Sequence, residues 1–149
     1  GVDTVMSLPW VSGFTEAEGS FYIVCKDSST GRYCHAFGVT QRGNHLVMEA
    51  LRCYFKIGAQ VKLSTPKLGS LGTQNDTSFY KIETTHWRTL QHIRDVFLGS
   101  LLGMKSLEFR IWERSMKFRT QYDKLEKIHF LMRRIRKRWQ IDDIENTNV

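Results

Sequence analysis

The chain lacks the features that mark secreted, zinc-binding or membrane-spanning proteins. Its three cysteines, Cys25, Cys34 and Cys53, are odd in number and have none of the short paired spacings of a zinc module or a disulfide framework, so we expect reduced, structural thiols. No apolar run approaches the roughly 20 residues that span a bilayer, and no charged and apolar leader opens the sequence. We therefore expect no membrane partner.

Internal repeats and low-complexity segments are also missing from the sequence. We expect a single domain over residues 1–149, with an acidic and polar tail that frays after Ile141. The length is sufficient for a hydrophobic core without disulfide bonds. Any doubling of the fold must then come from a second copy of the chain.

The chain carries an excess of positive charge. Lysine and arginine total 22 against 15 acidic residues, which gives a formal net charge of +7. Such a balance favours a polyanionic partner, with nucleic acid as the first candidate and an anionic membrane surface as its competitor. The content of 41% hydrophobic and 25% charged residues is that of an ordinary globular protein, so we expect the chain to fold by itself.

Hydrophobic periodicity and turn signals predict the order helix, hairpin, helix, hairpin, helix, followed by further helices. Ser7, Asn44 and Thr85 are the expected caps of the first three helices, and Gly58 is the expected stop of the second. Pro66 opens a polar loop that we expect to be mobile. The expected helices cover residues 7–17, 44–58, 85–97, 105–118 and 124–139, and the expected strands cover 20–26, 32–41, 60–64 and 78–83.

The most informative segment is WVSGFTEAEGSF at residues 10–21, a short helix that ends in an acid and a glycine and enters a strand at once. Trp10, Gly13, Phe14 and Ala17 recur at helical spacing and share one face. Gly13 and Ala17 would let a second helix backbone approach closely, while the two aromatic rings fill the flanks. The face therefore suits a helix that pairs with a copy of itself.

This segment resembles the motif helix of the LAGLIDADG homing endonucleases. In that family, two motif helices pack at a pseudo-twofold axis and the last acid of each helix binds catalytic metal. The resemblance implies an α+β fold of order αββαββα, with helices on one face of a four-stranded antiparallel sheet and DNA on the other. It implies a homodimer paired through the motif helix, which cuts both strands of a long, nearly palindromic DNA site with Mg²⁺, while Ca²⁺ or Mn²⁺ can substitute for binding.

The resemblance also assigns roles within the site. The carboxylate of Glu18 and the backbone carbonyl of Ala17 would hold the metal, although the namesake motif has aspartate where this chain has Glu16 and Glu18. Gln41 would position the metal-bound water, and Lys105 would lie near the scissile phosphate, with Arg42 and His45 as second choices. Glu16 points around the helix from Glu18, so we expect it to cap or bridge near the helix end.

Alternation along the predicted strands separates a core face, with Phe21, Ile23 and Cys25, from a polar face that can lie along a major groove. An ordinary solvated sheet face is the alternative interpretation, but it needs no concentration of Arg, Lys and Gln. Cys34 and Gly38 can extend the polar face. The expected DNA-binding residues of the sheet are Ser20, Tyr22, Val24, Lys26, Arg32, Thr40, Gln60, Lys62, Ser64, Phe79 and Lys81.

A run of basic residues at 133–138 lies in the last predicted helix. Its basic side should face solvent because the apolar positions of the same helix form a buried stripe. We expect Arg133, Arg134 and Lys137 to contact DNA phosphates and to add affinity without sequence information. The expected stripe consists of Leu125, Ile128, Met132, Ile135 and Trp139.

Two other functions use the same fold. The chain could be a maturase that binds a structured intron RNA, or a DNA-binding regulator that does not cleave. Retention of Glu18 and Gln41 favours cleavage, because a maturase can lose its metal-binding acids. Family members are commonly encoded within introns of organelle genomes, so the resemblance suggests a mitochondrion or chloroplast.

Overall fold

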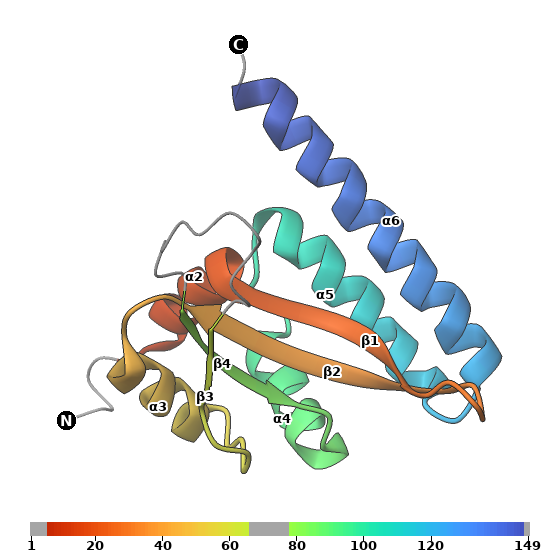
Figure 1. The fold of residues 1–149 in the computed structure, drawn as a ribbon, viewed down its shortest axis with the longest axis horizontal. Coiled ribbons are helices and arrows are strands. Elements are labelled where there is room, and N and C mark those ends of the chain that lie inside the picture. Colours follow the sequence, from red (N-terminus) through yellow and green to blue (C-terminus); the bar gives the residue numbers. More distant parts are fainter. Residues whose placement is uncertain (1–5, 66–77, 148–149) are drawn as a thin grey trace.

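The computed structural model describes residues 6–65 and 78–147, with side chains through residue 140. The predicted mobile loop after Pro66 lies outside the described residues. One antiparallel sheet of four strands in the order β1-β2-β4-β3 is packed against helices (Figure 1), which confirms the α+β class and the αββαββα order. The elements are α2 (Leu8–Glu18), β1 (Gly19–Asp27), β2 (Arg32–Gln41), α3 (His45–Tyr54), β3 (Lys62–Ser64), β4 (Phe79–Thr84), α4 (Trp87–Phe97), α5 (Gly103–Ser115), the 3-10 helix η1 (Met116–Phe118) and α6 (Tyr122–Thr147).

Several predicted boundaries differ from the structure, and three of these differences have a local reason. Helix α3 begins at the Asn44 cap as expected but ends at Tyr54, where Lys56 takes the left-handed conformation with φ of 58° in place of the expected Gly58. Helix α4 begins at Trp87, because the Thr84 hydroxyl accepts the His86 N–H at 3.1 Å and holds the chain in a turn past Thr85. Strand β3 begins at Lys62, which leaves Gln60 outside the sheet.

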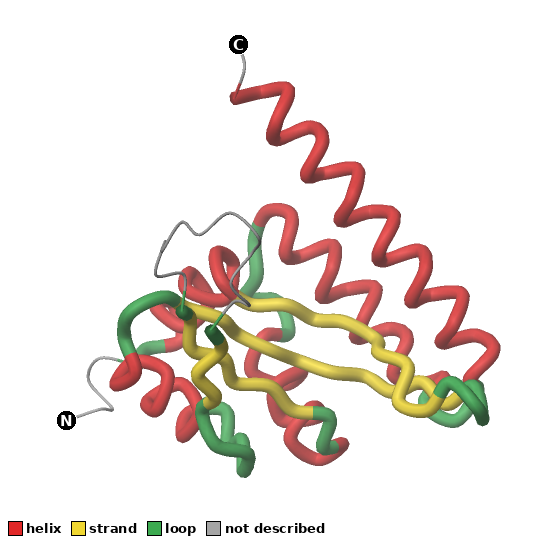
Figure 2. Tube along the Cα trace, in the orientation of Figure 1, coloured by secondary structure: helices red, strands yellow, loops and turns green. Residues whose placement is uncertain are grey.

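Helices α5 and α6 lie side by side along β1, the edge strand of the sheet (Figures 1 and 2). Helix α6 continues to Thr147, past the point after Ile141 where fraying was expected. Leu125 and Met132 are buried, whereas Ile128, Ile135 and Trp139 are half-buried. The predicted stripe is therefore the side of α6 that packs against the rest of the protein, and three of its five residues remain partly exposed.

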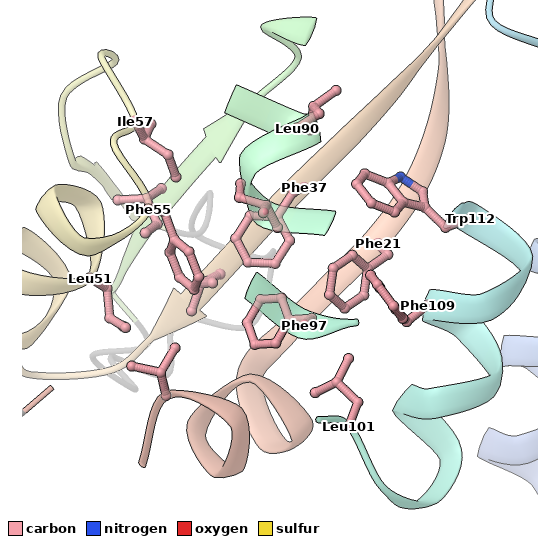
Figure 3. Packing of buried hydrophobic residues seen from close by; sticks show 14 of the residues in the cluster. Phe21, Phe37, Leu51, Phe55, Ile57, Leu90, Phe97, Leu101, Phe109 and Trp112 are labelled. Carbon is pink, nitrogen blue, oxygen red and sulfur yellow. The ribbon is translucent and has the colours of Figure 1, made fainter. Parts of the chain in front are cut away.

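Aromatic side chains fill the space between the sheet and the helices (Figure 3). The Phe21 ring lies 5.1 Å from the Phe37 ring, 5.0 Å from Phe109 and 5.1 Å from Trp112. Tilted and edge-on contacts of this kind stabilise the fold beyond their buried area. The core thereby fixes β1, the strand that directly follows α2, against α5.

The histidines and cysteines form no metal cluster in the part of the chain that the structure describes. His35 is buried beside Ser115 Oγ at 2.8 Å, and burial lowers its pKa to about 4, so it is neutral at pH 7. The cysteines are free thiols as expected, but Cys25 and Cys53 lie on the surface, so only the half-buried Cys34 fits a structural thiol. No helix within residues 6–65 and 78–147 is long and apolar enough to cross a bilayer.

Candidate functional site

Helix α2 passes into β1 with no intervening loop. The Ser7 hydroxyl accepts the Trp10 N–H at 3.4 Å and starts the helix, and the Gly19 N–H donates to the Thr15 carbonyl at its end. A side chain at position 19 would lie 2.6 Å from Thr15 Cγ2 and 2.9 Å from Thr15 O, so only glycine fits there. The close approach fixes the direction of the chain directly after Glu18.

One side of α2 faces solvent in the single chain. Trp10, Gly13 and Ala17 are exposed and Phe14 is half-buried, while Val11, Ser12 and Thr15 on the other side are buried. The Trp10 and Phe14 rings stack at 5.3 Å, and a methyl group added at Gly13 would meet no atom within 4 Å. The structure thus brings together the four residues predicted to pair with a second helix, and Glu18 is exposed at the end of this helix.

The carboxylate of Glu16 is hydrogen-bonded to the start of a neighbouring helix. Its Oε1 accepts the Leu102 N–H at 2.6 Å, directly before α5 begins at Gly103. A carboxylate at a helix N-terminus satisfies a free amide and interacts favourably with the helix dipole. The bridging role expected for Glu16 is confirmed, and Glu18 is left as the acid of α2 that faces solvent without a described partner.

Lys105 reaches the end of α2 from a segment far along the sequence. Its Nζ donates to the Gly19 carbonyl at 2.5 Å and lies 3.4 Å from Glu108 Oε2. A hollow of about 330 Å³ opens here between α2, α5 and α6. It is lined by Glu16, Ser20, Met104, Lys105, Glu108, Arg136, Trp139 and Gln140.

The sequence did not predict two charged residues that surround Lys105. Glu108 has only 8% of its side chain exposed and accepts the Phe21 N–H at 3.2 Å. Arg136 donates to Glu108 Oε1 at 2.7 Å and to the Phe21 carbonyl at 2.5 Å, so it turns inward from the basic run that was expected to face solvent. The i, i+3 spacing of Lys105 and Glu108 is the one signal for this group in the sequence.

Gln41 ends β2 beside the start of β1. Gly19 pairs with Val39, so Gln41 lies two residues past the partner of Gly19, roughly 7 Å along the strand. The side-chain Oε1 of Gln41 is buried and accepts no hydrogen bond from the described residues. Arg42 and His45 are the second candidates for the basic residue near the scissile phosphate. Both are exposed, and His45 Nε2 lies 3.6 Å from Glu49 Oε1.

The donors near the end of α2 fit a hard divalent cation. Glu18 offers an exposed carboxylate, Ala17 a backbone carbonyl and Gln41 a buried amide oxygen, and oxygen donors are the ligands that Mg²⁺ and Ca²⁺ prefer. A single chain contributes one free acid to this group. A second α2 at the exposed helix face would contribute the second acid.

The open face of the sheet carries the predicted polar residues in register. Ser20 pairs with Gly38, Thr40 with Lys81 and Ser64 with Phe79, and paired residues of antiparallel strands point to the same side. The pairing therefore places the predicted strand residues on one face, except that Gln60 lies outside the strands and Lys26 lies at the irregularity between Cys25 and Asp27. Their role in DNA binding stays a prediction. The predicted members of this face within the strands are Ser20, Tyr22, Val24, Lys26, Arg32, Thr40, Lys62, Ser64, Phe79 and Lys81.

Glu83 is an acid on this face that was not predicted. Its carboxylate lies 3.1 Å from Lys81 Nζ, 3.8 Å from Lys62 Nζ and 3.1 Å from the Tyr22 hydroxyl. Partial burial opposes its ionisation, but the bonds and charges of Lys81 and Tyr22 hold the pKa of Glu83 below its usual value. Burial and the adjacent Glu83 raise the pKa of Tyr22. Glu83 therefore orients two lysines and one tyrosine and lowers the positive charge of the face.

The basic side of α6 is exposed at three of the predicted positions. Arg133, Arg134 and Lys137 face solvent, and with Phe130 they line a shallow hollow of about 790 Å³. No ion pair involving these three side chains is formed among residues 6–65 and 78–140. Their charge is available to a polyanion.

The structure thus contains a four-stranded antiparallel sheet preceded by a helix that ends in the exposed acid Glu18. The family model described as LAGLIDADG endonuclease matches residues 11–116, so the chain belongs to the LAGLIDADG homing endonuclease family.

Two kinds of comparison find proteins that are similar to this chain. A probable intron-encoded endonuclease, Cox1-I1b of Schizosaccharomyces pombe, is 28% identical over 138 residues, which covers 93% of this chain and 34% of that protein. The chain thus spans about a third of the length of this curated relative. Among solved structures, the homing endonuclease I-TnaI has a TM-score of 0.64 at 18% identity, covering 89% of this chain and 97% of that one.

Two further solved structures contain DNA. The archaeal intron-encoded homing endonuclease I-Vdi141I, complexed with DNA, has a TM-score of 0.64 at 20% identity and covers 86% of this chain and 82% of that one. The LAGLIDADG homing endonuclease I-GzeII, in complex with its DNA target, has a TM-score of 0.65 at 18% identity. The match covers 83% of this chain and 43% of that one. The chain therefore covers most of the length of I-TnaI and I-Vdi141I but less than half of I-GzeII.

Proposed function

We propose that the chain is a site-specific DNA endonuclease that uses a divalent metal and acts as a homodimer paired through α2. One observation carries this proposal: the exposed face of Trp10, Gly13 and Ala17 leads directly to the exposed acid Glu18. Pairing two such faces across a twofold axis brings two carboxylates together, which is tolerable when a cation lies between them. A long, nearly palindromic target follows from the same symmetry.

Glu18 and the Ala17 carbonyl would hold Mg²⁺, with Ca²⁺ or Mn²⁺ as substitutes for binding. When bound, such a metal would activate a water for attack on phosphorus and would stabilise the leaving 3′ oxygen. Gln41 offers its free amide oxygen as an acceptor that can orient a water. Lys105 places an ammonium beside Gly19, where it can stabilise negative charge that develops on a phosphate.

The open sheet face would read the DNA, and the basic side of α6 would bind phosphates. The sheet presents hydroxyls, lysines and a tyrosine of fixed orientation, which suits contacts to base edges in a major groove. The DNA-bound relatives I-Vdi141I and I-GzeII support this assignment.

The combined substitution Arg133→Gln, Arg134→Gln and Lys137→Gln is expected to weaken DNA binding about equally on the specific target and on random DNA. Phosphate contacts carry affinity without sequence information, and their loss also flattens the dependence of log Kd on log salt. Gel shifts at several salt concentrations measure both effects. Selective weakening on the specific target would show that these side chains read bases, and an unchanged salt slope would show that they do not contact DNA.

Two alternatives keep the fold and change the partner. A maturase would bind intron RNA, and a regulator would bind DNA without cutting it. Glu18 is exposed at the end of α2, which favours cleavage over either alternative. The match to an intron-encoded relative supports an intron origin, and we propose an organelle, mitochondrion or chloroplast, as the compartment.

A cleavage selection tests the proposal. The protein is incubated with Mg²⁺ and a library of randomised double-stranded DNA that includes intron-insertion sequences, and the cut ends are sequenced. The expected result is cut ends that cluster on one nearly palindromic sequence. Binding of the library without cut ends would indicate the regulator. A parallel gel shift with intron RNA that shows binding of the RNA but not of the DNA would indicate the maturase.

A further inference from the structure

The outer edge of β1 is covered by side chains in place of another strand. The Gly19 carbonyl accepts from Lys105, the Phe21 N–H donates to Glu108, and the Phe21 carbonyl accepts from Arg136. The Ile23 carbonyl lies 2.6 Å from His129 Nδ1, which must therefore carry a proton. Helices α5 and α6 thus satisfy an edge that would otherwise be free, and they hold the chain that leaves Glu18.

Glu108 is the centre of this arrangement. A carboxylate with 8% exposure is strongly destabilising unless it is paired and hydrogen-bonded, and Glu108 has the Phe21 N–H and two cations as partners. Arg136 approaches Glu108 Oε1 to 2.6 Å, whereas Lys105 Nζ lies 3.4 Å from Glu108 Oε2. Glu108 thus contacts two cations at the edge of β1, and the ammonium of one of them, Lys105, is directed to Gly19.

The Lys105 side chain is held in one place by these contacts. It is 19% exposed, and its ammonium is directed to the Gly19 carbonyl, one residue past Glu18. A lysine has a long stem with many rotamers, so placing its charge within a narrow region requires fixed partners. We propose that Glu108, anchored by Arg136, is a positioning residue that holds Lys105 for cleavage; this inference rests on the proposed function.

The proposal separates cleavage from binding. The Glu108, Lys105 and Arg136 group covers the outer edge of β1. The residues assigned to DNA reading lie on the open face of the sheet, and Ser20 is the one among them that also lines the hollow beside Lys105. Loss of Glu108 should therefore lower the rate of the cutting step and leave the affinity for the target unchanged. Helix α6 would influence cleavage through Arg136.

The test is a double-mutant cycle on the target found by selection. Glu108→Gln keeps an acceptor for the Phe21 N–H but removes the charge, and it is expected to lower the single-turnover rate in Mg²⁺ by about 10- to 100-fold. Binding measured in Ca²⁺ should be unchanged. In a Lys105→Met background, the same substitution should cause no further loss, because the residue it positions is gone.

Control variants separate an effect on the position of Lys105 from an effect on the stability of the fold. Glu113→Gln removes another acid of α5 that does not contact Lys105, and this variant should cleave at the parental rate. If Glu108→Gln does not fold, Glu108→Gln with Arg136→Met restores the charge balance and should remain slow. An equal loss in the parent and Lys105→Met backgrounds, or a parental rate in the charge-balanced variant, would overturn the role of Glu108. A parent that cuts no DNA would instead overturn the proposed function.

Discussion

Cleavage by a Glu18→Gln variant is expected to fall by several orders of magnitude while specific DNA binding survives. Glutamine keeps the size of the side chain but is a poor ligand for Mg²⁺, so the metal would be lost from the end of α2. The sheet face that we propose as the DNA-binding surface does not include position 18. Single-turnover cleavage and gel shifts on the same DNA measure the two effects, with Glu126→Gln on the exposed side of α6 as the control.

The same variant has an expected effect in the absence of metal. Two close carboxylates repel each other when no cation lies between them, so the neutral variant should unfold at no lower temperature and bind its site no more weakly than the parent. Cleavage by Glu18→Gln at the parental rate would show that Glu18 is not a metal ligand. A loss of binding equal to the loss of cleavage would show a structural role.

Gly13→Leu is expected to abolish pairing of α2 and cleavage together. A side chain at Gly13 meets no atom within 4 Å in the single chain, and leucine is a better helix former than glycine by up to about 1 kcal/mol. The folded chain should therefore be at least as stable as the parent, while a second helix can no longer approach. Light scattering gives the mass, and the cleavage assay gives the activity.

The matched control for this change is Gly58→Leu. Gly58 also has open space around it and an ordinary backbone conformation, but it lies far from α2 along the chain. It should keep the parental mass and activity. If Gly13→Leu remains dimeric and cuts DNA, the exposed face of α2 is not the pairing surface.

Local patterns in the sequence account for the part of the site that lies on α2 and the sheet. Small and aromatic residues at helical spacing predict the exposed face of α2, and alternation predicts which side chains of β1 and β2 point to each side. The same alternation extends from Lys81 to Glu83, so the acid that binds Lys62 and Lys81 could have been found. Such patterns depend on neighbours within a few residues.

The group around Lys105 could not be predicted in the same way. Lys105 and Gly19 are separated by 86 positions, and Arg136 and Phe21 by 115, so their contacts depend on how α5 and α6 pack along β1. Arg136 stands in a run of basic residues whose neighbours Arg134 and Lys137 face solvent, and its position at the margin of the apolar stripe turns it inward. Resemblance to the family located Lys105, but it gave no indication of Glu108.

Helix and strand ends differ from the predictions where single side chains compete with the backbone. The Thr84 hydroxyl holds the turn before α4, and Glu16 holds the start of α5 from another helix. A sequence pattern shows that a helix is present, but its first residue depends on which hydrogen bond forms there.

Plasmid cleavage under three metal conditions tests most directly whether this chain cuts DNA with a metal held at the end of α2. A plasmid that carries the selected target is incubated with the parent protein in Mg²⁺, in Ca²⁺ and in a chelator, and the products are separated on a gel. The expected products are linear plasmid in Mg²⁺, bound but intact plasmid in Ca²⁺, and intact plasmid in the chelator. Linear plasmid in the chelator, or intact plasmid that is bound in Mg²⁺, would contradict this mechanism.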